Sequence, residues 1–394
     1  MTGSVPATGS RVFTTLLPLT VAVFLAFLTI GMQLPVLPLH LKTVLGMGPV
    51  VIGVVVGAQF AAALLSRAGA GTFADLRGSR RAVWAGLVTA AASGVVTVLS
   101  LPFVDTPSLS VAVLLLGRVV LAVGESLIIT GALGWGVGLV GPQNAGKVMV
   151  WNGIAIYGAF ALGAPLGVAV SARWGMTGVG LATVVLPLAA GLLLGGMRAV
   201  APSAVRRTPF YRVLGAVWVP GLGLALSSIG LGVISAFAAL LFTARGWGDA
   251  GLVFTAFGVA FIVARLLFGS LPDRLGGARV ALISVLIEAV GMLVIWGAET
   301  AAMACLGAAL TGFGYSLAFP GFGVEAVRRA PPQTRGLAMG AYVAFLDLAL
   351  GITGPLAGVL ADSRGLAAVF AAGAVAVALS ALVALRLWMQ PRPA

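Results

Sequence analysis

Charged side chains are scarce in this sequence. Only 8% of its 394 residues are charged, and 60% are hydrophobic. Because soluble domains carry roughly 25% charged residues, this composition excludes a soluble globular protein. Apolar runs recur along the whole length, and each has the roughly 20 residues that a helix needs to cross a bilayer. Short segments of alternating polarity, which build membrane β-barrels, do not occur. We therefore expect an all-α polytopic membrane protein in contact with the lipid bilayer.

Side chains that catalyse reactions or bind metals are equally scarce. The chain has one histidine, His40, and one cysteine, Cys305, which can form no internal disulfide. No cluster of His, Asp and Glu predicts a catalytic centre or a metal site. No Gly-x-x-x-x-Gly-Lys-Ser/Thr sequence predicts ATP binding. We therefore expect no enzyme activity, no cofactor and no metal.

The net charge of +13 comes from arginines that stand singly or in pairs between the apolar runs. This placement is the orientation signal of membrane proteins and argues against nucleic-acid binding. We predict twelve transmembrane helices. Their expected spans are 14–39, 48–74, 80–103, 108–138, 145–171, 176–198, 211–243, 249–271, 278–297, 300–327, 335–361 and 365–388.

The basic residues also predict the orientation in the membrane. If both termini are cytoplasmic, sixteen Lys and Arg residues lie on inner segments and four on outer loops. An excess of Lys and Arg marks cytoplasmic loops, so both termini are expected in the cytoplasm. The one candidate linker, 199–210, divides the chain into six-helix halves at 1–198 and 211–394.

Two internal repeats relate these halves. The polar loop at 71–81 resembles residues 269–279 at an offset of 198, and the same offset pairs Arg67 with Arg265. Two parallel halves are typical of transporters that bind their substrate between the halves, near the midplane of the membrane.

The second repeat has an offset of 190 residues. Residues 124–127 match residues 314–317, and Pro165 matches Pro355 at the same offset. The two offsets fall on different helices of the halves. Both therefore support the same duplication of six helices.

The polar loop resembles the signature of the major facilitator superfamily, Gly-x-x-x-Asp-Arg/Lys-x-Gly-Arg-Arg. It departs from that signature at Leu76 and Ser79, where basic residues are usual. The resemblance implies a cytoplasmic gate that holds the outward-facing state. Its residues would be Gly71, Asp75, Gly78, Arg80 and Arg81, with Gly269, Asp273, Arg274 and Gly276 in the second copy.

Two further motifs are similar to those of proton-coupled members of the superfamily. Arg118 followed by Gly124 resembles their arginine motif, and the run 158–167 resembles their Gly-Pro antiporter motif. The helix-packing residues implied are Gly158, Gly163, Pro165 and Gly167, with Gly354 and Pro355 in the second half.

The resemblance covers all twelve spans and extends to the twelve-span drug:proton antiporter subfamily, of the bacterial "arabinose efflux" type. It implies a proton-coupled exporter of small organic molecules, a monomer in the bacterial inner membrane that works by alternating access. Three alternatives stay open: uptake, export of sugars or metabolites, and a membrane protein that transports nothing. Charged residues within the spans favour transport, because they are costly in a bilayer.

Arg118 and Glu125 are the strongest candidates for chemistry. Both lie well inside the fourth span, where an ionised side chain costs several kcal/mol unless it is paired or hydrated. Being seven residues apart, they share one helix face at a spacing of about 10 Å. Glu125 could bind and release the transported proton, or the two residues could form a buried structural pair.

Asp347, in the eleventh span, is the second candidate proton carrier. A cavity acid favours a cationic substrate, whereas Arg118 could accept an anion, so the charge of the substrate stays open. Gln33, Gln59, Asn152 and Tyr315 could also line the cavity.

Four other charged residues are expected to play lesser roles. We expect Glu288 at the periphery and Glu325 as a solvated charge at a helix end. Arg67 and Arg265 either extend to the interface or support the gate.

Overall fold

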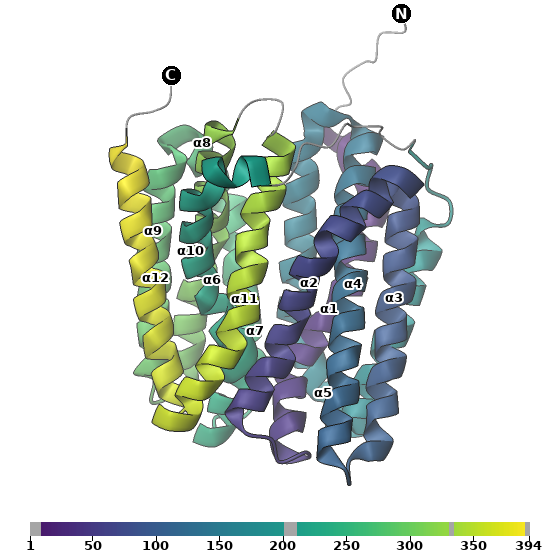
Figure 1. The fold of residues 1–394 in the computed structure, drawn as a ribbon, viewed down its shortest axis with the longest axis vertical. Helices are drawn as coiled ribbons and strands as arrows, with labels where there is room; N and C mark the ends of the chain where they lie inside the picture. The colour runs from purple at the N-terminus through teal and green to yellow at the C-terminus, as the bar shows by residue number, and fades with distance from the viewer. Residues whose placement is uncertain (1–8, 201–210, 331–334, 391–394) are drawn as a thin grey trace, which may run out of the picture.

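The computed structural model describes residues 9–200, 211–330 and 335–390, which fold into a bundle of helices (Figure 1). The first five helices are α1 (Gly9–Thr43), α2 (Pro49–Arg77), α3 (Ser79–Ser100), α4 (Pro107–Val140) and α5 (Ala145–Leu194). The others are α6 (Tyr211–Arg245), α7 (Gly251–Phe268), α8 (Leu271–Leu275), α9 (Gly277–Trp296), α10 (Ala301–Arg329), α11 (Arg335–Arg364) and α12 (Leu366–Met389). The expected all-α class is confirmed.

Eleven helices in the described part of the chain are long and apolar enough to cross a membrane, one fewer than the twelve spans expected. The difference lies in α5, whose 50 residues include both the fifth and the sixth expected span. A helix of that length would extend about 75 Å, more than twice the thickness of the hydrocarbon core. The chain turns inside α5 at Gly175, where φ is 58° and ψ is −157°. Glycine adopts this backbone conformation without a steric penalty, so α5 can cross the membrane twice.

The helices pack into two groups, seen side by side in Figure 1. The first group is α1–α5 and the second is α6–α12, and each has an apolar core of its own. Packing between the groups joins α2 to α11, α5 to α7, and both α1 and α2 to α6. The expected linker at 199–210 lies outside the described residues, apart from its first two positions, so the domain boundaries stay a prediction.

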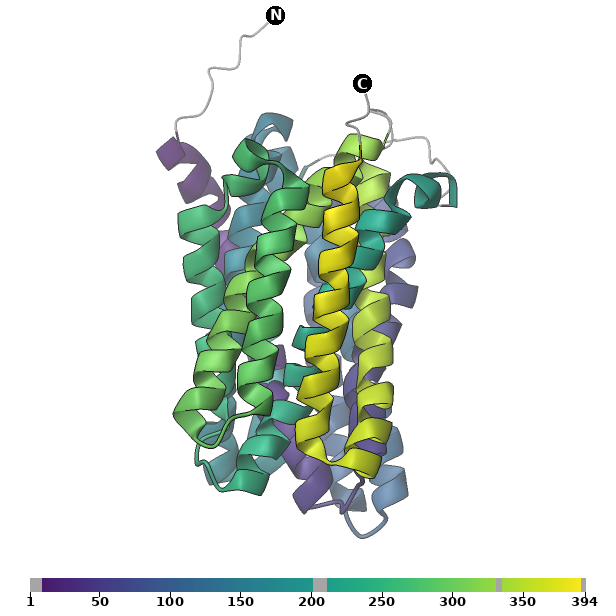
Figure 2. The same cartoon turned by 90° about the vertical axis from the view of Figure 1, so that its left-hand side faces the viewer.

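The first helix begins and the last helix ends at the same end of the bundle, the upper end in Figures 1 and 2. We call this the terminal end and the other the opposite end. An even number of crossings requires this arrangement.

Close backbone contacts between the groups lie at the opposite end. A Cβ atom on Gly354 of α11 would lie 2.2 Å from the carbonyl oxygen of Gly53 of α2. A Cβ on Gly251 of α7 would lie 2.8 Å from the Cα of Pro165. Towards the terminal end, by contrast, a Cβ on Gly71 or Gly340 would meet no atom within 4 Å. Figure 1 shows α2 and α11 diverging in that direction.

We expect Gly354→Val to separate α2 and α11 at the opposite end. Overpacking of this kind costs typically about 1–3 kcal/mol, which changes the ratio of two conformations by roughly 5- to 150-fold. Spin labels are placed at Asp105 and Glu299, which are exposed loop residues of the two groups. Double electron–electron resonance should report longer distances between these labels in the variant. Gly340→Val on the same helix is the control, because its Cβ meets open space. Equal distance distributions in both variants would contradict the prediction.

The two copies of the polar loop share an unusual backbone conformation. Gly78 has φ 91° and ψ 144°, and Gly276 has φ 95° and ψ 139°. Only glycine adopts such positive φ values readily. The copies differ just before this residue, since α2 continues to Arg77 whereas the second copy breaks into the short helix α8. Pro272 in α8 accounts for the break, because proline removes a backbone donor from the helix.

Candidate functional site

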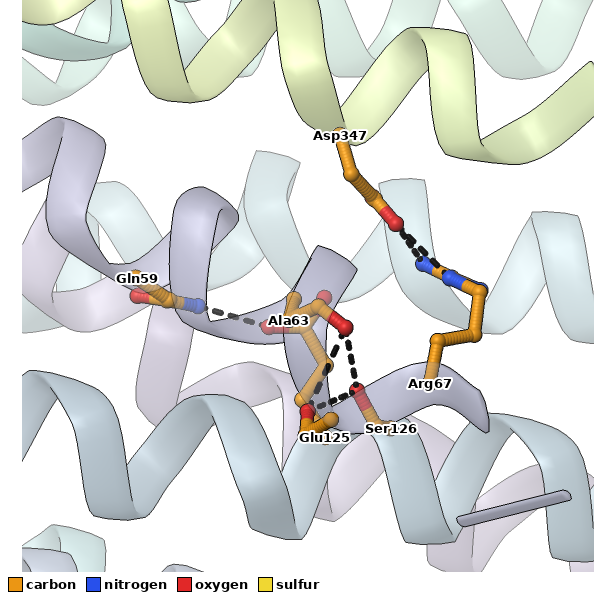
Figure 3. Close-up of polar contacts among 7 residues, drawn as sticks. Gln59, Ala63, Arg67, Glu125, Ser126 and Asp347 are labelled. Carbon is orange, nitrogen blue, oxygen red and sulfur yellow. Dashed lines mark hydrogen bonds and ion pairs between the residues drawn. The ribbon is translucent and has the colours of Figure 1, made fainter. Parts of the chain in front are cut away.

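An ion pair joins the two helix groups in the interior of the bundle. Arg67 of α2 donates from Nε to Oδ2 of Asp347 of α11 at 2.7 Å, and its Nη2 contacts the same oxygen. The side chain of Asp347 is only 4% exposed and that of Arg67 is 20% exposed. Figure 3 shows the two side chains reaching across from their helices. The sequence singled out Asp347 and left Arg67 undecided, but nothing in the sequence pairs them.

Glu125 lies on α4 and faces α2. Its Oε2 accepts a hydrogen bond of 2.7 Å from Nε2 of Gln59. Next to it, Oγ of Ser126 lies 2.9 Å from Oγ of Ser66 and 3.2 Å from the carbonyl oxygen of Ala63 (Figure 3). Glu125 is half-buried, and the hydrogen bond from Gln59 holds its carboxylate against α2.

Arg118 is buried, with 5% of its surface exposed, and faces α1. Its Nη1 donates to Oε1 of Gln33 at 2.9 Å, and Nε2 of Gln33 donates to Oγ1 of Thr183 at 3.1 Å. Within the described residues, Arg118 and Glu125 form no ion pair. A directly bonded structural pair, the alternative left open for these residues, is therefore not formed in this conformation.

An aromatic cluster lies where α5, α7 and α10 meet. The ring of Tyr157 stacks on that of Phe261 with centroids 3.6 Å apart, and lies 6.4 Å from the ring of Tyr315. The guanidinium of Arg265 lies over Phe261, 5.3 Å from the ring centroid. Tyr315 in this cluster was among the residues proposed for the cavity from the sequence. The matching positions of Arg67 and Arg265 in the repeat were the signal that could have found the cluster.

Asn152, another residue proposed for the cavity, is buried in α5, and its Nδ2 has no partner among the described residues. Tyr315 is fully buried, and its hydroxyl lies 3.5 Å from Oγ of Ser228. Apart from Asn152, the cavity residues proposed from the sequence thus lie in four small networks. These are the pair of Asp347 with Arg67, the pair of Glu125 with Gln59, the pair of Arg118 with Gln33, and the aromatic cluster that contains Tyr315.

The gate residues proposed from the sequence lie at the terminal end. In the first copy, Asp75 lies in the last turns of α2, while Arg80 donates to the carbonyl oxygen of Gly195 at 3.0 Å. In the second copy, Asp273 and Arg274 lie in α8. Asp75 and Asp273 are both exposed. The remaining members are Gly71 in α2, Gly78 between α2 and α3, Arg81 in α3, Gly269 after α7 and Gly276 before α9.

The proposed helix-packing residues divide between two kinds of contact. A Cβ on Gly163 or Gly167 would collide with the backbone of α1, so these two lie inside the first group. Pro165 and Gly354 lie at contacts between the groups, as does Pro355, whose Cδ would lie 3.0 Å from a Cβ on Gly57. Gly158 faces more open space, with its nearest neighbour at 3.6 Å.

Two expectations about acidic residues are wrong. Glu288 is not peripheral but fully buried, and its Oε2 accepts a hydrogen bond of 2.6 Å from Ser227, because it lies on the face of α9 that packs against α6 and α10. Glu325 is not a solvated charge, since only 8% of it is exposed. It accepts from the backbone nitrogen of Ala278 at 3.2 Å and pairs with Arg329 at 2.7 Å. The first turn of α9 attracts this carboxylate, as helix N-termini do.

The interior of the bundle thus offers proton-binding carboxylates, hydrogen-bonding amides and guanidinium groups, all held on membrane-length helices. No group of three or more His, Cys, Asp or Glu residues that could hold a metal ion occurs in the part of the chain described. The arrangement suits reversible binding of protons and of a polar organic molecule.

Comparisons with known proteins agree with this description. A sequence profile described as the Major Facilitator Superfamily matches residues 19–247 and 221–394. An uncharacterised MFS-type transporter of Salmonella typhimurium is 47% identical over 369 residues, which cover 94% of this chain and 95% of the relative. Another, from Pseudomonas aeruginosa, is 46% identical over 348 residues, covering 88% of this chain and 86% of the relative.

Solved structures share the fold at low sequence identity. The nucleoside transporter NupG matches with a TM-score of 0.75 and 15% identity, over 95% of this chain and all of its own. The human organic anion transporter MFSD10 matches with a TM-score of 0.70 and 16% identity, over 96% of this chain and all of its own. The expected fold is thereby confirmed.

Proposed function

Because this chain belongs to the Major Facilitator Superfamily of secondary transporters, we propose that it is a proton-coupled exporter of small organic molecules. One observation carries the proposal: Asp347 of the second group is paired with Arg67 of the first. A proton on Asp347 neutralises its carboxylate and removes the attraction that joins α11 to α2. Proton binding would then change the relative stability of two arrangements of the groups, as alternating access requires.

Glu125 is the second proton carrier in this proposal. Its carboxylate is held by Gln59 of α2, the helix that also bears Arg67. A proton that binds Glu125 weakens the bond to Gln59, and so acts on the same helix as a proton on Asp347. Arg118, with Gln33, would keep a positive charge on one side of this carboxylate and tune how readily it gives up the proton.

We further propose that the terminal end is cytoplasmic, because most Lys and Arg residues outside the spans lie there. The close contacts at the opposite end would then close the outer side, and this conformation would be inward-facing. The gate residues, with Asp75 and Asp273, would meet the other group when the terminal end closes. The bacterial relatives support a place in the inner membrane, and we propose that one chain acts alone.

A proton-flux assay tests the function. Purified protein is reconstituted in liposomes that contain the pH dye pyranine, and aromatic carboxylates, phosphonates, nucleosides, sugars and quaternary amines are added in turn under an imposed pH gradient. We expect at least one class of compound to cause a proton flux that empty liposomes lack. If a compound is shown to cross the membrane through the protein and none of the compounds causes a proton flux, proton coupling is excluded.

A further inference from the structure

Arg265 is a half-buried cation without an acidic partner among the described residues. Its guanidinium lies over the ring of Phe261, and within the described residues it forms no hydrogen bond or ion pair. The rings of Tyr157 and Tyr315 lie next to Phe261, with centroids 3.6 Å and 6.3 Å from its own. A guanidinium stays charged and is costly to bury unless something compensates its charge. Arg265 therefore carries a positive charge that no acidic side chain among the described residues neutralises.

The repeats show what is missing next to Arg265. The offset of 198 relates it to Arg67, and the offset of 190 relates Asp347 to Tyr157. The contact of Arg67 with Asp347 joins α2 to α11, and the related helices α7 and α5 also pack together. Where the first site has a carboxylate, the second has a phenol. Arg265 is thus the symmetry-related equivalent of Arg67, but no acid stands at the position equivalent to Asp347.

Several donors in the interior are buried without a hydrogen-bond partner among the described residues, namely Nε of Arg118, Nε of Arg265 and Nδ2 of Asn152. Two acceptors, Oε1 of Gln59 and Oε1 of Glu288, also lack one. Buried donors without partners are costly. A ligand rich in acceptor oxygens would satisfy them, whereas a cation would add to the positive charge of Arg265.

We propose that the transported substrate carries an anionic group, of the carboxylate or phosphonate class, that binds Arg265. This group takes the place that Asp347 takes at Arg67. A flat apolar part of the substrate packs on the ring of Tyr157, which is only partly buried, as aromatic rings do on one another. The inference rests on the proposed function and names the class of its substrate.

Thermal stabilisation of purified protein in detergent tests the inference without a proton gradient. The test compounds are benzoate and phenylphosphonate, with neutral benzamide and cationic benzylamine as matched compounds. We expect a saturable rise in melting temperature with the anions alone. Arg265→Gln should weaken anion binding about 10- to 100-fold, since a charge-assisted hydrogen bond is lost. Arg279→Gln is the control, because Arg279 also covers an aromatic ring, at 5.1 Å from Trp388, but outside the cluster.

A second variant distinguishes loss of anion binding from misfolding of Arg265→Gln. Tyr157→Asp gives Arg265 an internal carboxylate, as Arg67 has, and should abolish anion binding while the protein remains folded. The inference is overturned if benzamide or benzylamine stabilises the protein as well as the anions do, if no anion stabilises it, or if Tyr157→Asp binds anions normally. A proton flux driven by a neutral or cationic compound is compatible with each of these results. The proposed function can therefore hold even if the proposed substrate class is wrong.

Discussion

Replacing Asp347 with asparagine is expected to lower the melting temperature and to abolish proton-driven transport. Asp347 is the acid that contacts Arg67, and it is almost wholly buried. Asparagine cannot balance the charge of Arg67, and breaking a buried pair by removing one partner costs about 3–5 kcal/mol. The variant also cannot bind and release a proton at this position. Differential scanning fluorimetry and the pyranine assay measure the two effects.

The double variant Asp347→Asn with Arg67→Gln separates them. It removes both charges, so we expect the melting temperature to recover while proton-driven transport stays absent. Asp362→Asn is the matched control, because Asp362 is an exposed acid on the same helix. It should change neither quantity. Wild-type stability and flux in Asp347→Asn would refute the coupling role of the pair.

Replacing Glu125 with glutamine is expected to reduce proton flux about 100-fold or more, a size typical for the loss of an essential proton-transfer group. The fold should be unaffected, because glutamine has the same shape and its carbonyl oxygen can still accept the hydrogen bond from Gln59. Exchange of substrate between the two sides without net proton movement should persist. Pyranine fluorescence reports the flux, and counterflow of labelled substrate reports the exchange.

Glu299→Gln is the control for this variant, because Glu299 is an exposed glutamate before α10. Its flux should match that of the wild type. If Glu125→Gln keeps its proton flux and Asp347→Asn loses it, Asp347 alone carries the proton. If counterflow is lost together with flux, Glu125 binds the substrate and not only the proton.

The architecture could be predicted from the sequence because it depends on local composition and on repetition. Long apolar runs require membrane helices, since an unpaired backbone group is costly in lipid. The loop at 71–81 and its copy predicted two related turns, and Gly78 and Gly276 do share one backbone conformation. The cost of a charge within the membrane likewise singles out Arg118, Glu125 and Asp347 from their positions in the apolar runs.

The tertiary structure alone decided which side chains meet. Arg67 and Asp347 are 280 residues apart in the chain, and periodicity says which face a residue lies on but not what faces it. For the same reason the burial of Glu288 and Glu325 was predicted wrongly. The burial of Glu288 depends on the packing of α9, and that of Glu325 on the first turn of α9. Only the packing of α5 against α7 brings Tyr157 to the cluster around Arg265. At the related position of the repeat, Arg67 has the acid Asp347, whereas Arg265 has the phenol of Tyr157. Composition and repeats thus determined the fold and its costly residues, whereas long-range packing determined the partners of those residues.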